Sequence, residues 1–115
     1  MRSALVTAIA LVAVAVPGAA VARPAATKPV VISITAVNAK PVGGIKRQTV
    51  KKGQTVRLVI RTNVGTQVHL HGYNIEKDVL PGQAVRMPFT ANIAGRFEVE
   101  LHPTDALLAV LEVKP

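Results

Sequence analysis

Thr55-Val56-Arg57-Leu58-Val59-Ile60-Arg61-Thr62 is the stretch that decides the fold. Val56, Leu58 and Ile60 occupy every second position of this stretch. Both of its arginines, Arg57 and Arg61, lie at the other positions. Successive side chains of a β-strand point to opposite faces of the sheet. This order therefore predicts a strand with one face in an apolar core and the other face in water.

Similar short segments recur along the chain, and turn residues such as Lys52-Gly53 and Pro81-Gly82 separate them. Turn signals come about every 8–12 residues and no segment has a helical period, which favours an all-β domain. We predict an antiparallel Greek-key β-sandwich or barrel of about seven strands over residues 30–115. The expected strands are residues 30–37, 48–51, 55–62, 67–73, 83–89, 96–101 and 107–113, with 74–80 as a connection or a short irregular strand.

The N-terminal residues 1–22 are typical of a secretory signal peptide. Arg2 precedes an uncharged apolar run from Ala4 to Val16, and Ala20-Val21-Ala22 fits an Ala-x-Ala cleavage site. The run is shorter than the roughly 20 residues of a transmembrane helix. We predict a cleaved signal, a flexible leader over residues 23–29, and a secreted or periplasmic mature chain without a transmembrane segment. An uncleaved anchor is the alternative.

The composition narrows the classes of function. The 115 residues carry 14 lysines and arginines against 6 acidic residues, for a formal net charge of +8. Basic proteins can bind nucleic acid, but this chain has only two phenylalanines, one tyrosine and no tryptophan on which bases could stack. We expect no nucleic-acid binding. We find no catalytic triad, no acid–base pair of carboxylates and no cysteine nucleophile, and we expect no enzyme.

The three histidines are the candidate site. His69 and His71 lie two residues apart in the expected strand 67–73, so they share a face. His102 follows another expected strand. If the fold brings His102 beside the pair, three neutral imidazoles converge, and this set suits Cu(II) or Zn(II).

Nearby carboxylates could complete such a site. Glu76, Glu100 or Asp105 could supply an oxygen ligand or orient a histidine ring. The histidines could also be structural, either exposed to water or hydrogen-bonded to the backbone. The residues alone leave both interpretations open.

Several motifs in their order along the chain resemble the cupredoxin family. They are Lys52-Gly53-Gln54-Thr55-Val56, the histidine strand 67–73, Pro81-Gly82-Gln83, Ala94-Gly95-Arg96-Phe97 and finally His102. The chain is most similar to the bacterial exported cupredoxin-like domains related to plastocyanin and to subunit II of cytochrome oxidase. The resemblance extends over nearly all of the expected domain.

The resemblance implies a copper ion held by a histidine of a middle strand and by a later loop with cysteine, histidine and methionine. His69 fits the first histidine and His102 the second. Val99 stands at the cysteine position and Leu107 near the methionine position. A blue-copper centre depends on the cysteine thiolate, so we expect neither that centre nor electron transfer of the plastocyanin type.

Two functions remain as hypotheses. The first is a non-blue copper-binding protein that holds its ion with His69, His71 and His102 for sequestration or delivery, with zinc as a possible alternative metal. The second is a metal-free accessory module whose basic face meets an acidic partner, a protein or a polymer, in the cell envelope.

Overall fold

The computed structural model describes residues 9–18 and 28–115. Residues 9–18 are exposed and have no regular secondary structure. The expected cleavage site Ala20-Val21-Ala22 and most of the expected leader 23–29 lie outside the described residues, so the signal peptide stays a prediction. Among the residues that are described, none forms a helix of the length and hydropathy needed to cross a bilayer.

Residues 28–115 fold into strands and turns, which confirms the all-β class. The strands over residues 30–37 and 55–62 have the predicted bounds. Residues 75–79 form a strand, which was one of the two expectations for residues 74–80. The nine strands are β1 (Val30–Val37), β2 (Lys40–Pro41), β3 (Lys46–Lys51), β4 (Thr55–Thr62), β5 (Thr66–Leu70), β6 (Ile75–Val79), β7 (Val85–Thr90), β8 (Gly95–His102) and β9 (Ala106–Lys114).

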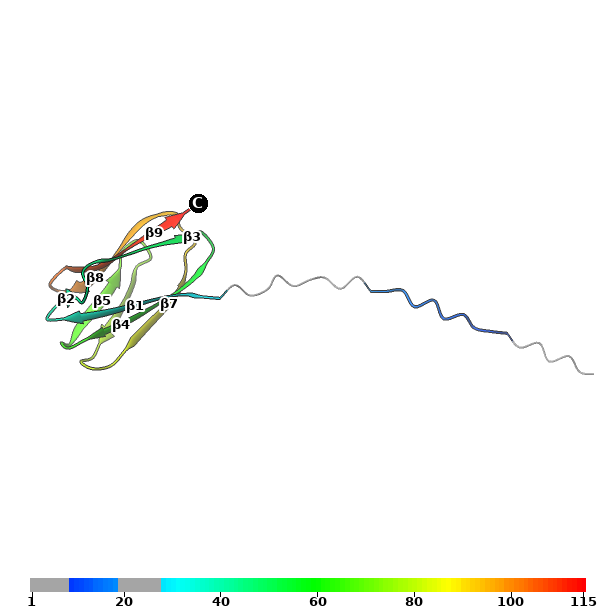
Figure 1. The fold of residues 1–115 in the computed structure, drawn as a ribbon, viewed down its shortest axis with the longest axis horizontal. Coiled ribbons are helices and arrows are strands. Elements are labelled where there is room, and N and C mark those ends of the chain that lie inside the picture. The colour runs from blue at the N-terminus through cyan, green and yellow to red at the C-terminus, as the bar shows by residue number, and fades with distance from the viewer. Residues whose placement is uncertain (1–8, 19–27) are drawn as a thin grey trace, which may run out of the picture.

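The strands form two sheets, which Figure 1 shows as two facing layers. One has the order β2-β1-β4-β7, and we name it the arginine sheet after the exposed arginines of β4 and β7. The other has the order β3-β9-β8-β5-β6, and we name it the histidine sheet because β5 and β8 carry His69 and His102.

Both sheets are mixed, which departs from the expected purely antiparallel pairing. β1 runs parallel to β4, and β3 runs parallel to β9. Parallel neighbours cannot be joined by a hairpin and need a crossover. Here the chain crosses to β3 in the histidine sheet between β1 and β4, so those two strands enter the arginine sheet in the same direction. Local alternation does not reveal such a crossover.

The core lies between the sheets, as the alternation in β4 predicts. Val56, Leu58 and Ile60 are fully buried, and both arginines of the strand are exposed. The inward residues of the histidine sheet, including Leu70 and Leu101, are also fully buried. Because neighbouring positions on a strand face opposite ways, the residues beside these leucines point away from the core.

Candidate metal centre

The histidine site is built on the outer face of two paired strands. β5 and β8 are antiparallel, with Gln67 opposite His102 and His69 opposite Glu100. Leu70, the neighbour of His69, is buried in the core, so His69 is turned outward. The same alternation turns Glu100 and His102 outward on β8. The fold thus brings together residues that are about thirty positions apart in the sequence.

His71 joins this face although its strand has ended. β5 stops at Leu70 rather than continuing through the predicted residue 73. The His71 N–H nevertheless donates to the Glu98 carbonyl at 3.0 Å, which extends the ladder by one residue. His71 therefore keeps the outward direction that the sequence predicted for it.

The three imidazole rings lie close together. The ring centroids are 4.3 Å apart for His69 and His71, 5.1 Å for His69 and His102, and 5.9 Å for His71 and His102. One nitrogen from each ring can be chosen so that all three atoms lie within 4.8 Å of one another. The structure brings all three histidines of the sequence into one cluster.

Two ring nitrogens in the cluster lack a hydrogen-bond partner. His69 Nδ1 and His102 Nε2 are shielded from solvent, and within the described residues no atom forms a hydrogen bond with them. Buried polar atoms without partners are costly and rare, and a missing ion or water is one physical reason for them. Metal–imidazole bonds of about 2.0–2.1 Å place neighbouring ligand nitrogens roughly 3–3.5 Å apart. The three histidines place one nitrogen each within 4.8 Å of the others, so the type and placement of these residues fit a bound ion.

Two carboxylates contact the histidines. Glu100 Oε2 lies 3.0 Å from His71 Nε2 and 3.8 Å from His102 Nε2. Asp105 Oδ1 lies 3.6 Å from His102 Nδ1. Glu76, opposite His69 on β6, is exposed and belongs to no group of convergent donor atoms among the described residues. Of the three acidic residues considered from the sequence, Glu100 therefore has the closest contact with the cluster.

The turn after His71 is fixed by a close aromatic contact. Gly72 has φ of 84°, and a Cβ atom at this position would lie 2.3 Å from Phe97 Cδ1. Tyr73 packs on Phe97 and Phe89 with ring centroids 4.7 and 4.9 Å apart, and its hydroxyl donates to the Ile93 carbonyl at 2.9 Å. Only glycine has both the backbone freedom and the small size that this position requires.

The positions that the resemblance linked to cysteine and methionine supply no sulfur. Val99 is fully buried and belongs to the core, so it lies on the opposite face of β8 from His102. Leu107 is half-buried on β9 and pairs with Glu100. Met87 is fully buried in β7, which belongs to the arginine sheet. The donors available at the site are imidazole nitrogens and carboxylate oxygens.

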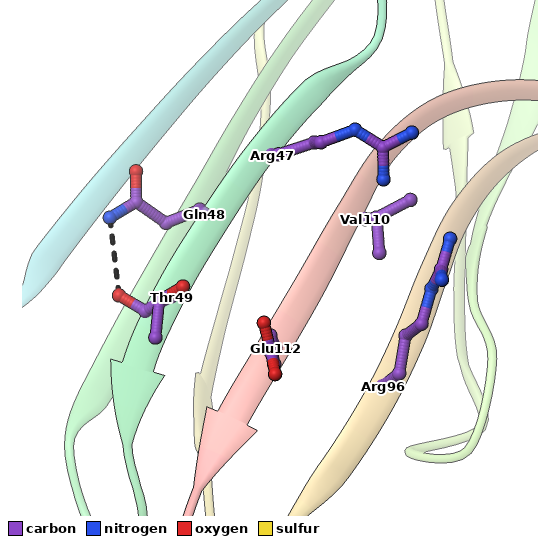
Figure 2. Close-up of a pocket in the computed structure, with 6 residues that line it drawn as sticks. All are labelled: Arg47, Gln48, Thr49, Arg96, Val110 and Glu112. Atoms are coloured by element: carbon purple, nitrogen blue, oxygen red, sulfur yellow. Dashed lines mark hydrogen bonds between the residues drawn. The ribbon is translucent and has the colours of Figure 1, made fainter.

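A hollow of about 150 Å³ lies elsewhere on the histidine sheet (Figure 2). Arg47 from β3 and Arg96 from β8 flank Val110 and Glu112 of β9. The hydrogen bond from Lys114 lowers the pKa of the exposed Glu112 carboxyl, and the charge of Arg96 lowers it further. No histidine lines this hollow, so it is separate from the histidine cluster.

Two of the solved structures similar to this chain are a copper binding protein and a multicopper oxidase. A copper binding protein, determined in solution in its apo form, superposes with a TM-score of 0.59 and 14% identity over 73% of this chain and 86% of that protein. The multicopper oxidase Fet3p, which functions in iron import, superposes with a TM-score of 0.61 and 16% identity over 76% of this chain. The chain spans only 23% of Fet3p.

No protein-family model and no curated protein matches the sequence. At 14% and 16% identity, the two superpositions establish the fold. The chain has no cysteine, so it lacks the thiolate on which a blue-copper centre depends. The chain is thus a cupredoxin-like β-sandwich without the cysteine ligand of a blue-copper centre.

Proposed function

We propose that this protein is an exported, non-enzymatic carrier that binds Cu(II) at His69, His71 and His102 for sequestration or delivery. The observation that carries the proposal is the convergence of three imidazole nitrogens within 4.8 Å of one another. The likeness of the fold to that of a copper binding protein supports the choice of metal. The signal-like residues 1–22 support export.

The donor atoms favour Cu(II) among the divalent ions. Imidazole suits copper and zinc, whereas thiolate and thioether ligands select Cu(I). With equal ligands, Cu(II) is bound more tightly than Zn(II), as the Irving–Williams order states. A site of three histidines without sulfur is therefore suited to copper in its oxidised form, with zinc as the weaker competitor.

The exposure of the site suits a carrier. The side chains of His71 and His102 are 44% and 30% exposed. An acceptor protein can therefore reach the ion and replace the ligands one at a time. In this account the ion is the cargo, and the chain's own residues bind it, orient its ligands and release it.

The test is calorimetric titration of the purified protein with Cu(II) and Zn(II). We expect one-to-one binding, tighter for Cu(II), and its loss when His69, His71 or His102 is changed to alanine. Gln67→Ala is the matched control, because Gln67 is an exposed polar residue of β5 on the same face and pairs with His102. Equal affinities for the wild type and the three histidine variants would reject the site.

A second candidate function rests on the uneven distribution of acidic residues between the two sheets. All six acidic residues lie on the histidine sheet or in the turn between β8 and β9; they are Glu76, Asp78, Glu98, Glu100, Asp105 and Glu112. The arginine sheet carries Arg57, Arg61 and Arg86 on exposed positions and contains no acidic residue. Such a face suits an accessory module that docks on an acidic protein or polymer.

This second function is tested with a soluble polyanion, such as polyglutamate, and a variant with glutamine at the three arginines. Salt-sensitive binding by the wild type, absent from the variant, is expected if the face docks on acidic partners. Equal binding by both proteins would mean that the three arginines do not bind the polyanion, and it would reject this function for the arginine sheet. Neither result bears on the histidine site, which lies on the other sheet.

A further inference from the structure

Glu100 differs from the other acidic residues of the chain in its surroundings. Its side chain is only 15% exposed, and it lies on β8 opposite His69 and two residues before His102. Its Oε2 is 3.0 Å from His71 Nε2, within hydrogen-bonding distance. Glu100 is therefore a largely buried carboxylate on the same face as the three histidines, and its contacts there indicate its role.

The contact between Glu100 and His71 determines which nitrogen of His71 carries the hydrogen. A carboxylate oxygen can only accept a hydrogen bond, so His71 Nε2 must donate. A neutral imidazole has a single N–H, and with that hydrogen on Nε2 the lone pair is on Nδ1. Glu100 therefore leaves His71 Nδ1 as the atom that can bind a cation.

The other two rings have complementary arrangements. His69 Nδ1 is buried and has no partner among the described residues, so it is free to act as a ligand. His102 Nε2 is in the same condition, while its Nδ1 faces Asp105 at 3.6 Å, beyond hydrogen-bonding distance. One nitrogen per ring thus remains for a cation, and Glu100 makes the one short carboxylate contact in the cluster.

We propose that Glu100 is the positioning residue of the site: it holds the Nε2–H of His71 and presents His71 Nδ1 to the ion. This inference rests on the proposed metal-binding function and deepens it. Carboxylates that accept the second N–H of a ligand histidine fix the ring orientation and increase the basicity of the ligand, and their loss commonly weakens metal affinity about 10–100-fold. Glu100 also adds a negative charge that favours a divalent ion.

Glu76 provides the matched control. It lies opposite His69 on β6, just as Glu100 lies opposite His69 on β8, so both carboxylates flank the same histidine. Glu76 is exposed, and the structure shows no side-chain bond from it to a histidine within residues 28–115. Removing either residue takes away one charge beside His69, but only the change at Glu100 removes the hydrogen bond to His71.

The experiment compares four proteins: wild type, Glu100→Ala, Glu100→Gln and Glu76→Ala. Calorimetry gives the Cu(II) affinity of each, and long-range ¹H–¹⁵N spectra of the apo and Zn(II) forms report which nitrogen of His71 carries hydrogen. We expect Glu100→Ala to lose about 10–100-fold in affinity and Glu76→Ala to lose less than about threefold. Glu100→Gln should recover most of the affinity, because its amide oxygen accepts the same hydrogen bond.

The spectra give a result that does not depend on the affinity. In the apo wild type, His71 should be the Nε2–H tautomer, and in Glu100→Ala it should become a mixture. A Gln variant as weak as the Ala variant would overturn the positioning role, because a direct ligand or a purely charge-based effect would then be at work. Unchanged affinity in Glu100→Ala would overturn it as well.

The outcomes separate this inference from the proposed function. If the wild type binds Cu(II) and His69→Ala abolishes binding, the proposed function stands whatever the Glu100 variants do. If the wild type binds no metal, both the proposed function and the role of Glu100 are rejected. Thermal unfolding of each variant without metal checks that every protein compared is folded.

Discussion

Glu100 lies directly opposite His69 on paired strands, yet its carboxylate bonds to His71, the next outward residue along the chain. The diagonal contact is possible because residues two apart on one face of antiparallel strands lie within reach of long side chains. It links His71 of the His-x-His pair to the strand that carries His102. The site is therefore assembled by the pairing of β5 with β8.

The histidines should contribute little to the stability of the apo protein. His71 and His102 are substantially exposed, whereas Leu58 is fully buried in the core. Leu58→Ala should lower the free energy of unfolding by about 2–5 kcal/mol, because it leaves a cavity. His71→Ala and His102→Ala should each change it by far less in chemical denaturation. Histidine variants as unstable as Leu58→Ala would mean that the cluster is a structural element.

Metal should stabilise the wild type and not the histidine variants. A ligand that binds only the folded state at a concentration of 100 times its Kd adds about 2.7 kcal/mol to the stability. We expect Cu(II) to raise the Tm of the wild type, with no comparable increase in His69→Ala. An equal increase in both proteins would indicate binding away from the cluster.

Gly72→Ala should damage both the fold and the site. The change forces a non-glycine residue to φ of 84° and places a methyl group against the Phe97 ring. Gly53→Ala is the matched control, since Gly53 has φ of 95° but no atom within 4 Å of the position of a Cβ. The control measures backbone strain alone, of about 1–3 kcal/mol. Denaturation should show a larger loss for Gly72→Ala, with weaker Cu(II) binding. Equal losses would mean that the Phe97 contact is easily relieved.

Introduced cysteines should distinguish the two faces of β8. Glu100→Cys places sulfur on the face of the histidines, and Val99→Cys places it in the core. A thiolate bound to Cu(II) is what gives a blue-copper centre its character. Absorption spectroscopy of the Cu(II) forms should therefore show a strong visible band for Glu100→Cys and none for Val99→Cys or the wild type. A band in Val99→Cys alone would show that residue 99 can reach the ion.

The regular parts of the fold were predictable from the sequence because alternation is a local property. The pattern around Leu58 gave the bounds of β4, and the β-branched run Val30–Val37 gave those of β1. The parallel pairing of these two strands was not predictable, since it depends on a crossover through the other sheet. The short strand Lys40–Pro41 lies outside the strands expected from the sequence, because two residues are too few to show alternation.

The clustering of the three histidines was predictable in part from the sequence, whereas their contacts with carboxylates were not, and metal binding by these residues stays a prediction. The His-x-His spacing placed His69 and His71 on one face, and the structure brings His102 to the same place. Val99, which the resemblance placed at the cysteine position, is turned into the core, and its neighbour Glu100 has the outward position. Which of the nearby carboxylates contacts a histidine depends on the β5–β8 register, and sequence spacing does not reveal that register.

The most direct test of the central claim is a Cu(II) titration of the purified protein by calorimetry, with electron paramagnetic resonance of the copper form. We predict one-to-one binding with a Kd below about 1 µM, corresponding to about −8 kcal/mol, and nitrogen hyperfine structure from imidazole ligands. Substitution of His102 should weaken the binding and alter the spectrum. Weak binding that is unchanged in His102→Ala would contradict the three-histidine site and leave a cupredoxin-like fold without its metal.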